Sequence, residues 1–293
     1  MHVGFLGFGL IGGSIARAVR ANPSTAAWTM AAWSPSGHGP TSAAADRTID
    51  VAAPSPVDAT ADADLVVLAA PATTCLMLLN RLAGPWASSL RPATVITDVA
   101  SSKAQLVDRA ETLGLRFVGG HPMAGREDTG YAASTDDLFV DRPWVLTPST
   151  MTDREDTERV AVLVRACGST VIEMDPAVHD RAVAGISHLP MIVAAALAEA
   201  VAIGSGGSPG GDWPVAAGLA AGGWRDTTRV ARGDPAMGAA IAVTNADALA
   251  ERLRDLQAVL ETWILALERP GGPDEAAIEA RLSAARAALG DRG

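Results

Sequence analysis

The sequence is short of cysteine and has no run of basic residues, and each shortage excludes a class of protein. Only two of its 293 residues are cysteines, Cys75 and Cys167, and both lie in apolar segments. This argues against a disulfide framework and predicts a reducing compartment, the cytoplasm. The net charge is −10, with 23 basic and 33 acidic residues. Without a basic run, nucleic acid and anionic membrane surfaces are not expected partners.

Long apolar runs are also scarce. We expect no signal peptide ahead of the first strand, which begins at residue 3. The most apolar run, Leu189 to Ile203, is too short to cross a membrane and contains Pro190 and Glu199. It predicts a helix buried in protein. The length and the 48% hydrophobic content fit two globular domains of ordinary size.

A strand that runs directly into a glycine pattern predicts a dinucleotide site. Val3 to Leu6 is strand-like, G-x-G-x-x-G follows at once, and a helix continues from Ser14. The first glycine allows the tight turn, the second admits a pyrophosphate to the backbone, and the third lets helix and strand pack closely. The helix N-terminus offers free N–H groups to the phosphates. The cofactor residues expected here are Gly7, Gly9, Leu10, Ile11 and Gly12.

The acidic residue that NAD sites place after the second strand is missing. The expected strand, Trp28 to Trp33, is followed by Ser34-Pro35-Ser36-Gly37-His38. A carboxylate at this position would bond the ribose 2′-hydroxyl, whereas the hydroxyls of Ser34 and Ser36 and the imidazole of His38 suit a 2′-phosphate. We therefore favour NADP, with NAD possible. The alternative is a simple Ser-Pro turn, and no arginine follows Ser34.

Further apolar segments alternate with helices up to about residue 175. The expected strands are Asp64–Pro71, Thr94–Thr97, Phe117–Val118, Trp144–Leu146 and Thr170–Glu173. This alternation predicts an α/β Rossmann-type, doubly wound sheet. Ala70 and Pro71 end one strand at the carboxyl edge, where such sheets bind ligands, so we expect both at the cofactor. Ser102 and Gln105 have capping-box spacing, which makes Ser102 a helix cap and leaves Ser101 facing the crevice.

One histidine stands in a stretch rich in glycine and proline. Gly119 to Gly125 follows a strand-like run and predicts a tight loop carrying His121. Catalytic groups are common on loops held by a rigid scaffold. Taken alone, a structural histidine bonded to a backbone carbonyl is an equally good interpretation.

The chain beyond Glu173 shows no further strand pattern, so we predict a sheet domain at residues 1–175 and an all-α domain at 176–293. Asp175-Pro176 is a cap followed by proline at the first helical position. His179 and His188 are nine residues apart, on opposite faces of a straight helix, and are not expected to serve one site. A kink at Pro190 would aim His188 inward; the alternative is an ordinary core histidine.

Two later segments suggest a substrate contact and a subunit interface. If Gly222 to Arg229 is helical, Arg225 and Arg229 share a face. A guanidinium there suits a substrate carboxylate; the alternative is a surface salt-bridge pair. Asp247 to Glu268 is a long amphipathic helix, which would serve a dimer core or intrachain packing equally well.

Several segments, in this order, resemble the prephenate/arogenate dehydrogenase family of tyrosine biosynthesis. They are Gly7-x-Gly-Leu-Ile-Gly-Gly-Ser14, Asp98-x-x-Ser101-x-Lys103, Gly120-His121-Pro-Met-Ala-Gly125, His179-Asp180 with Ser187-His188-Leu-Pro190, and Trp224-Arg225-Asp226-x-Thr-Arg229. The resemblance covers residues 3 to about 240. It implies a Rossmann-type domain joined to a helical dimerisation domain, a homodimer, and an active site in the cleft between the domains.

The resemblance also implies roles for individual residues. Neutral His121 accepts the proton of the substrate hydroxyl while hydride leaves the same ring carbon for the nicotinamide, and carbon dioxide leaves from the opposite ring carbon. A histidine suits this because its usual pKa of about 6.5 lies near working pH. Ser101 hydrogen-bonds the hydroxyl or the histidine, and Arg225 holds the ring carboxylate. The other substrate-binding residues expected are His188, Ser187, Glu127 and Gly130, and no metal is expected.

Two departures from the family pattern favour arogenate, converted to tyrosine with NADP, over prephenate, converted to 4-hydroxyphenylpyruvate. Met191 stands where many prephenate-using members have histidine, and Ser34 replaces the acid. Two rival readings remain. A β-hydroxyacid dehydrogenase or imine reductase usually relies on a lysine, but Lys103, the only lysine, sits at a helix start. A non-catalytic NADP sensor would have no use for a proton acceptor such as His121.

Overall fold

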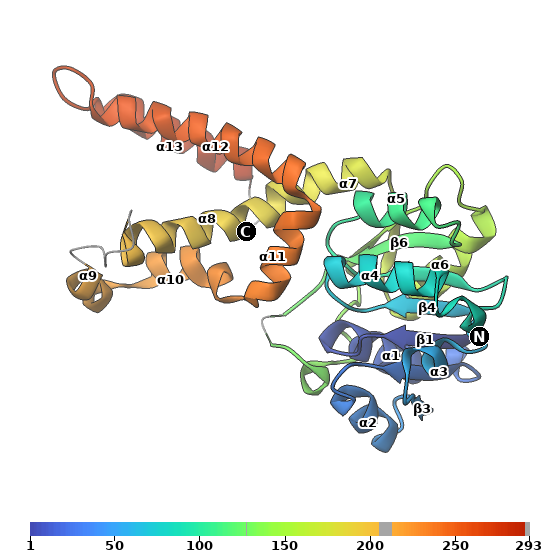
Figure 1. The fold of residues 1–293 in the computed structure, drawn as a ribbon. Helices are drawn as coiled ribbons and strands as arrows, with labels where there is room; N and C mark the ends of the chain where they lie inside the picture. The colour runs from blue at the N-terminus through green and yellow to red at the C-terminus, as the bar shows by residue number, and fades with distance from the viewer. Residues whose placement is uncertain (127, 205–212, 291–293) are drawn as a thin grey trace. The chain divides into compact units, whose positions relative to one another are not determined.

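The structure is a computed structural model that describes residues 1–126, 128–204 and 213–290 (Figure 1). It divides into two compact units, Met1–Ala246 and Asp247–Gly293. The boundary expected at residue 175 stays a prediction. The first unit contains an eight-stranded sheet. Its strands are β1 (His2–Leu6), β2 (Thr29–Trp33), β3 (Val51–Ala52), β4 (Leu65–Leu68), β5 (Val95–Asp98), β6 (Phe117–Pro122), β7 (Pro143–Thr147) and β8 (Thr170–Glu173).

The strand order is β3-β2-β1-β4-β5-β6-β7-β8, which confirms the predicted doubly wound sheet. Every pairing is parallel except that of β6 with β7. The short strand β3 was not predicted, because its two residues carry no periodic pattern. From β1 the strand order continues through β2 and β3 to one side of the sheet, and from β4 it continues through β5 to β8 to the other side. Ligands bind such sheets where the order changes direction, which here is at the carboxyl ends of β1 and β4.

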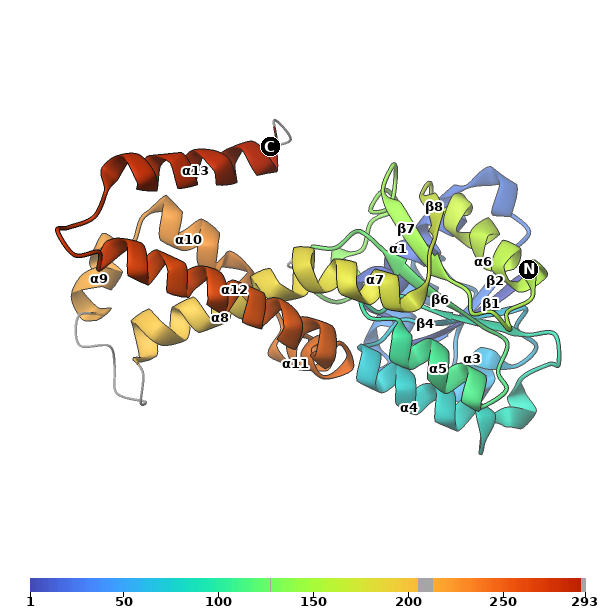
Figure 2. The same ribbon diagram turned by 90° about the horizontal axis from the view of Figure 1, so that it is seen from above.

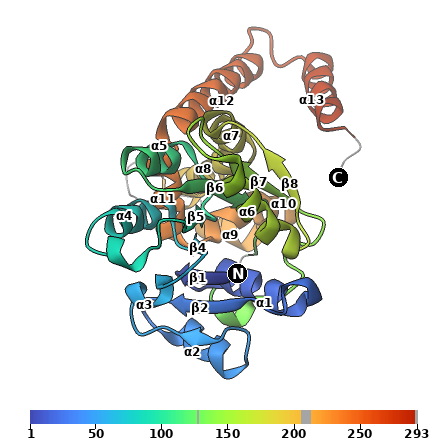
Figure 3. The ribbon, with the colours of Figure 1, turned by 90° about the vertical axis from the view of Figure 1, so that its right-hand side faces the viewer.

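Helices cover both faces of the sheet, as Figures 2 and 3 show. Alternate strand residues point to opposite faces: Phe5 packs in one buried cluster with residues of α1 and α6, and Leu6 packs in another with residues of α4 and α5. Both cysteines are buried free thiols. The flanking helices are α1 (Leu10–Ala21), α2 (His38–Ala45), α3 (Pro56–Thr60), α4 (Ala72–Ala83), α5 (Ala104–Thr112) and α6 (Arg154–Ala166), with short 3-10 turns η1 (Pro23–Thr25), η2 (Ala87–Ser89) and η3 (Tyr131–Ala133).

The stretch that carries His121 is a strand, not the tight loop that the sequence predicts. Strand β6 pairs with β5 through its first half and with β7 through Gly119 to Pro122. A Cβ on Gly119 would lie 2.3 Å from Thr147 Oγ1, and one on Gly120 would lie 2.6 Å from the Asp98 carbonyl oxygen. The glycines therefore mark close approach of neighbouring groups within the sheet. His121 is thereby held by a rigid element.

The helix after β8 is longer and more exposed than predicted. It runs unbroken from Pro176 to Ile203 as α7 (Pro176–Val183), a π-helical turn η4 (Ala184–His188), α8 (Leu189–Ala198) and a second π-helical turn η5 (Glu199–Ile203). By length and composition it could cross a membrane, and only 11% of its most apolar window is buried. The expectation of a short, buried helix is wrong. Pro190 does not break it because proline occupies the start of α8, directly after the π-helical turn.

The rest of the chain is helical, as predicted. The first unit ends with α9 (Trp213–Leu219), α10 (Gly222–Thr228), the 3-10 turn η6 (Arg229–Arg232) and α11 (Pro235–Thr244). The second unit consists of α12 (Ala246–Leu267) and α13 (Glu275–Leu289). Within it, the guanidinium of Arg281 on α13 stacks 3.9 Å from the ring centre of Trp263 on α12 and donates to Val259 O. This contact holds the two helices together.

Candidate active site

The glycine turn between β1 and α1 has the shape that a dinucleotide requires. Gly7 has a positive φ of 88°, and a Cβ there would lie 2.3 Å from Ala69 O. A Cβ on Gly9 would meet nothing within 4 Å, so this side of the turn is open to a ligand. A Cβ on Gly12 would lie 3.1 Å from that of Ala69. These are the three roles of the motif. The turn fits a pyrophosphate.

The first turn of α1 adds donors to this cradle. Leu10 and Ile11 begin the helix, no side chain caps it, and no acidic residue lies in its first turn. The neighbouring strand end supplies Ala70 and then Pro71, the residue before α4, at the same edge of the sheet. Free N–H groups at a helix start attract phosphate through hydrogen bonds and the helix dipole.

The residues after β2 form a turn that carries two hydroxyl groups. Gly37 N donates to Ser34 O at 3.0 Å, and Gly37 is left-handed with φ of 68°. The Ser36 hydroxyl accepts from His38 N at 3.4 Å, where α2 begins. The Ser34 hydroxyl oxygen is buried and has no hydrogen-bond partner within the described ranges. A buried polar atom without a partner is uncommon, so Ser34 has an unused hydrogen bond for a ligand.

Two serines follow β5, and the helix cap predicted for one of them is wrong. The Ser102 hydroxyl hydrogen-bonds Thr244 Oγ1 of α11 at 2.7 Å, and no cap bond forms from its side chain. The carboxylate of Asp180, on α7, instead accepts from the backbone N–H groups of Lys103 (2.7 Å) and Ala104 (2.9 Å). A cap supplied by a distant helix leaves no local pattern. Ser101 is partly buried at the carboxyl edge, where the sequence places it.

Histidines from two elements meet beside this edge. His121 Nδ1 lies 2.9 Å from Nε2 of His179, and His179 Nδ1 lies 2.8 Å from Asp180 Oδ1. His179 is buried, and His121 is partly buried. The sequence analysis counted His179-Asp180 among the segments of the family resemblance but gave neither residue a role in the site.

The expectation that His179 and His188 face different sites is wrong. The π-helical turn from Ala184 to His188 rotates less per residue than an α-helix. The angle about the helix axis between His179 and His188 therefore differs from that in a straight α-helix. His188 is buried, with its Nδ1 3.0 Å from Asn245 Nδ2. The same Asn245 amide donates to the backbone carbonyl of Asp180 at 2.8 Å, and the Asp180 carboxylate lies 2.8 Å from His179. His188 and His179 are therefore linked through Asn245 and Asp180.

Burial disfavours the charged forms of His121 and His188. The pKa of His121 is held well below its usual 6.5, first by burial and then by the positive charges of Lys103, His179 and His188. Burial lowers the pKa of His188 to about 4, against an opposing effect of Asp180. At neutral pH, His121 can thus accept a proton. Since Asn245 Nδ2 donates to His188 Nδ1, the proton of neutral His188 is on Nε2, which is buried without a partner among the residues described.

A buried ion pair lies under His121. Lys103 Nζ donates to Asp98 Oδ2 and to Gly120 O (2.7 Å), and both charged side chains are fully buried. Asp98 also accepts from Gly120 N (3.1 Å) and Ala100 N (2.9 Å). Burial raises the pKa of Asp98, and the charge of Lys103 opposes the rise. The pair ties the end of β5 to β6 one residue before His121.

The remaining predicted site residues are spread out. Ser187 and Arg225 are exposed, on η4 and α10. Gly130 has φ of 83° and precedes Tyr131, whose ring stacks 5.6 Å from that of Phe8 beside the glycine turn. The structure therefore places Gly130 next to the nucleotide cradle, and none of its described contacts reach the histidines. Glu127 lies outside the described residues.

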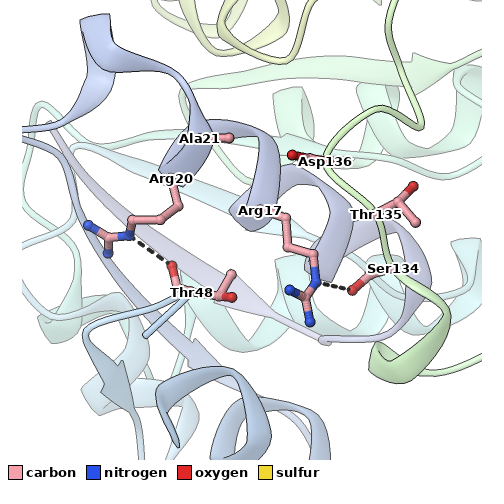
Figure 4. Close-up of a pocket in the computed structure, with 7 residues that line it drawn as sticks. All are labelled: Arg17, Arg20, Ala21, Thr48, Ser134, Thr135 and Asp136. Atoms are coloured by element: carbon pink, nitrogen blue, oxygen red, sulfur yellow. Dashed lines mark hydrogen bonds between the residues drawn. The ribbon is translucent and has the colours of Figure 1, made fainter. Parts of the chain in front are cut away.

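One cavity is separate from the histidines. It has a volume of about 420 Å³ and lies beside α1, lined by Arg17, Arg20, Ala21, Thr48, Ser134, Thr135 and Asp136 (Figure 4). Arg17 Nε donates to Ser134 Oγ at 2.9 Å, and Arg20 Nε donates to Thr48 O at 3.1 Å. Both guanidinium groups also pair with aspartates. Their charges are already neutralised, so this cavity lacks the chemistry of the site above.

Comparison with known proteins agrees with the fold. The nucleotide-binding domain of prephenate dehydrogenase matches residues 16–173, and its dimerization domain matches residues 175–272. Prephenate dehydrogenase of Bacillus subtilis is 34% identical over 266 residues, covering 90% of this chain and 67% of the relative.

Two solved structures are similar over almost the whole chain. Prephenate dehydrogenase from A. aeolicus, in complex with hydroxyphenyl propionate and NAD+, has 27% identity and a TM-score of 0.84, covering 99% of this chain and 97% of the other. Arogenate dehydrogenase of Synechocystis has 32% identity and a TM-score of 0.78, covering 99% and 100%.

Proposed function

Because the chain belongs to the prephenate dehydrogenase family of NAD(P)-dependent dehydrogenases, we propose that it converts prephenate to 4-hydroxyphenylpyruvate. In this reaction the bound nicotinamide takes a hydride from the hydroxyl-bearing ring carbon. The hydroxyl proton goes to a base on the protein. The bond between the opposite ring carbon and its carboxylate then breaks, carbon dioxide leaves, and the electron pair completes the aromatic ring. The ring oxygen takes up a proton to give the phenol.

The observation that supports this proposal most is a neutral imidazole on a rigid strand, at the same carboxyl edge of the parallel sheet as the dinucleotide cradle. Because its pKa is lowered, His121 is neutral at pH 7 with a lone pair available for a proton, and it is the base in our proposal. Ser101, at the carboxyl edge, hydrogen-bonds the reacting hydroxyl. The His188 Nε2–H group, buried without a protein partner in the described chain, is proposed to donate to the substrate, and Ser187 lies one residue before it.

Substitution of His121 tests the base. His121→Asn is expected to lower kcat by a factor on the order of 10² or more, with cofactor affinity measured by fluorescence unchanged. His2→Asn is the matched control. The His2 imidazole hydrogen-bonds Thr29 Oγ1, and these are the first residues of β1 and β2, at the opposite end of the strands from the site. Near-normal turnover of His121→Asn would show that another group is the base.

Arogenate is the second candidate substrate. Met191 favours it, since the missing histidine removes a polar contact, and one similar structure is an arogenate dehydrogenase. The curated relatives are named mainly as prephenate dehydrogenases, which supports the alternative better than our arogenate expectation. Initial rates with each substrate and each cofactor decide between them. A higher kcat/KM for arogenate would overturn the prephenate assignment but keep His121 as the base.

We propose that Arg225 holds the ring carboxylate. The segment around it packs on α8, which follows His188 directly. Arg225→Ala is then expected to raise the substrate KM more than it lowers kcat, because a lost carboxylate contact weakens binding. Arg229→Ala, one turn later, is the matched comparison. A rise in KM confined to Arg229→Ala would transfer the role to that residue. Roles for Glu127 and Gly130 stay predictions.

For the cofactor, we propose NADP over NAD. The support is the Ser34 hydroxyl, buried with an unused hydrogen bond, and the absence of an acidic side chain from Ser34 to His38. The similar A. aeolicus structure holds NAD+, which keeps NAD as the alternative. KM values measured for both cofactors with one substrate test the choice, and a lower KM for NAD would contradict it.

We also propose that the enzyme is a cytoplasmic homodimer. Residues 175–272 match a dimerization domain, and α12 exposes a row of apolar side chains, namely Leu260, Ile264, Leu265 and Leu267. The exposed apolar helix from Pro176 to Ile203 is explained in the same way, as a surface for a second copy. Sedimentation equilibrium without detergent would contradict the dimer if it gave a monomer mass.

A further inference from the structure

We propose that His179 and Asp180 are a positioning pair that fixes the tautomer of His121, leaving Nε2 of His121 as its only proton-accepting atom. The proposal rests on the proposed function, in which His121 is the base. It adds two residues that act through His121. The observation behind it is the continuous line Asp180–His179–His121, with 2.8 Å between the first two side chains and 2.9 Å between the last two.

The line starts from a carboxylate that cannot turn. Asp180 is buried, and its two oxygens accept from the backbone N–H groups of Lys103 and Ala104. Asn245 Nδ2 donates to its backbone carbonyl at 2.8 Å. An ionised carboxylate only accepts hydrogen bonds. The orientation of Asp180 is therefore set by the start of α5.

Each imidazole then has one favourable protonation state. The group facing Asp180 Oδ1 is Nδ1 of His179, so the proton of neutral His179 is on Nδ1 and its Nε2 is an acceptor. That acceptor faces Nδ1 of His121, which must donate. Nε2 of His121 is then left with its lone pair. If His179 instead carried its proton on Nε2, the lone pair of its Nδ1 would face the Asp180 carboxylate, which is unfavourable.

These tautomers of His179 and His121 suit a base at His121. When His121 takes the substrate proton on Nε2, it becomes a cation whose Nδ1–H still points at His179. Burial and the charge of Lys103, at the start of α5, disfavour that cation. The carboxylate of Asp180, at the far end of the hydrogen-bonded line, is an opposite charge that favours it. The pair thus does for His121 what the aspartate of a Ser-His-Asp triad does for its histidine: it orients the ring and stabilises the imidazolium.

The direct test is ¹⁵N NMR of the full-length protein labelled in histidine, at pH 8 without substrate. The His121 signals, assigned with His121→Asn, are expected to show a protonated Nδ1 and an unprotonated Nε2. In Asp180→Asn and His179→Leu, the His121 signals are expected to move toward the Nε2-protonated form. A wild-type His121 protonated on Nε2 would overturn the proposal whatever the activity of the enzyme.

Kinetics give a second readout. Asp180→Asn and His179→Leu are expected to lower kcat by a factor on the order of 10², and His179→Gln, which keeps an acceptor, to recover part of that loss. Without the charge of Asp180, the acidic limb of the pH profile moves to lower pH. Asp175→Asn, which alters the cap of the same helix, is the control and should change neither tautomer nor profile.

These outcomes separate the two proposals. If the tautomer is as expected but neither prephenate nor arogenate is turned over, the proposed function fails and the positioning pair stands. If turnover is normal in His179→Leu and Asp180→Asn, the pair fails and the proposed function stands.

Discussion

Breaking the ion pair under the active site is expected to be costly. Lys103 and Asp98 are both fully buried, and Lys103→Met removes the cation while Asp98 keeps only the backbone donors Gly120 N and Ala100 N. Leaving one member of a buried pair without its partner costs about 3–5 kcal/mol. We expect the free energy of unfolding in urea at pH 7 to fall by about that amount.

An exposed pair supplies the control for this experiment. Arg91 and Asp64 form an ion pair with roughly two fifths of each side chain exposed, at 43% and 37%. Exposed pairs contribute about 1 kcal/mol or less, so Arg91→Met should have a small effect. The double variant Asp98→Asn/Lys103→Met removes both charges and should recover part of the loss. A Lys103→Met variant no less stable than Arg91→Met would refute the reasoning.

The same substitution makes a kinetic prediction. Lys103 lowers the pKa of His121, because a nearby positive charge disfavours the imidazolium. Without it the pKa of His121 rises, and the base is protonated at a higher pH. The acidic limb of kcat/KM against pH should therefore move to higher pH in Lys103→Met. Movement to lower pH would contradict the electrostatic role given to Lys103.

Three further predictions follow from single positions. Gly120→Ala is expected to destabilise the protein by about 1–3 kcal/mol in urea unfolding, because its Cβ would lie 2.6 Å from Asp98 O, whereas Gly125→Ala, with nothing within 4 Å, should be near neutral. The pKa of His188 is lowered to about 4 in the folded protein, so below pH 6.5 the unfolded state binds more protons and the free energy of unfolding falls. His188→Leu should make the fall in the free energy of unfolding between pH 7.5 and pH 5 smaller by about 2 kcal/mol. An unchanged fall would contradict the buried neutral state. Ser34→Asp should raise the KM for NADP relative to that for NAD, since a carboxylate repels a 2′-phosphate, and an unchanged ratio would remove Ser34 from the cofactor site.

Local patterns predicted most of the sheet domain. Gly7, Gly9 and Gly12 carry the dinucleotide turn because the backbone conformation and clearance at each are properties of a few neighbouring residues. The cap at Asp175 was predictable for the same reason: it accepts from Val178 N three residues later, at 2.9 Å. Alternating strands and helices, read in order, were enough for the doubly wound fold.

Patterns failed where distant segments decide the local outcome. Gly119 and Gly120 predict a loop by composition, but the close approach of Thr147 and Asp98 makes them part of a strand. Ser102 has the spacing of a cap, but its hydroxyl bonds Thr244, 142 residues away. Neither partner is visible from the residues nearby.

The sequence by itself determined the family, the nucleotide cradle and His121 as the candidate base, because motifs and short-range periodicity encode them. Only the tertiary structure showed what surrounds that base. His179 lies 58 residues from His121, and a π-helical turn sets the phase between His179 and His188. The protonation of an imidazole depends on the groups packed against it in space, so the lowered pKa of His121 and the tautomer that we propose for it follow from the fold.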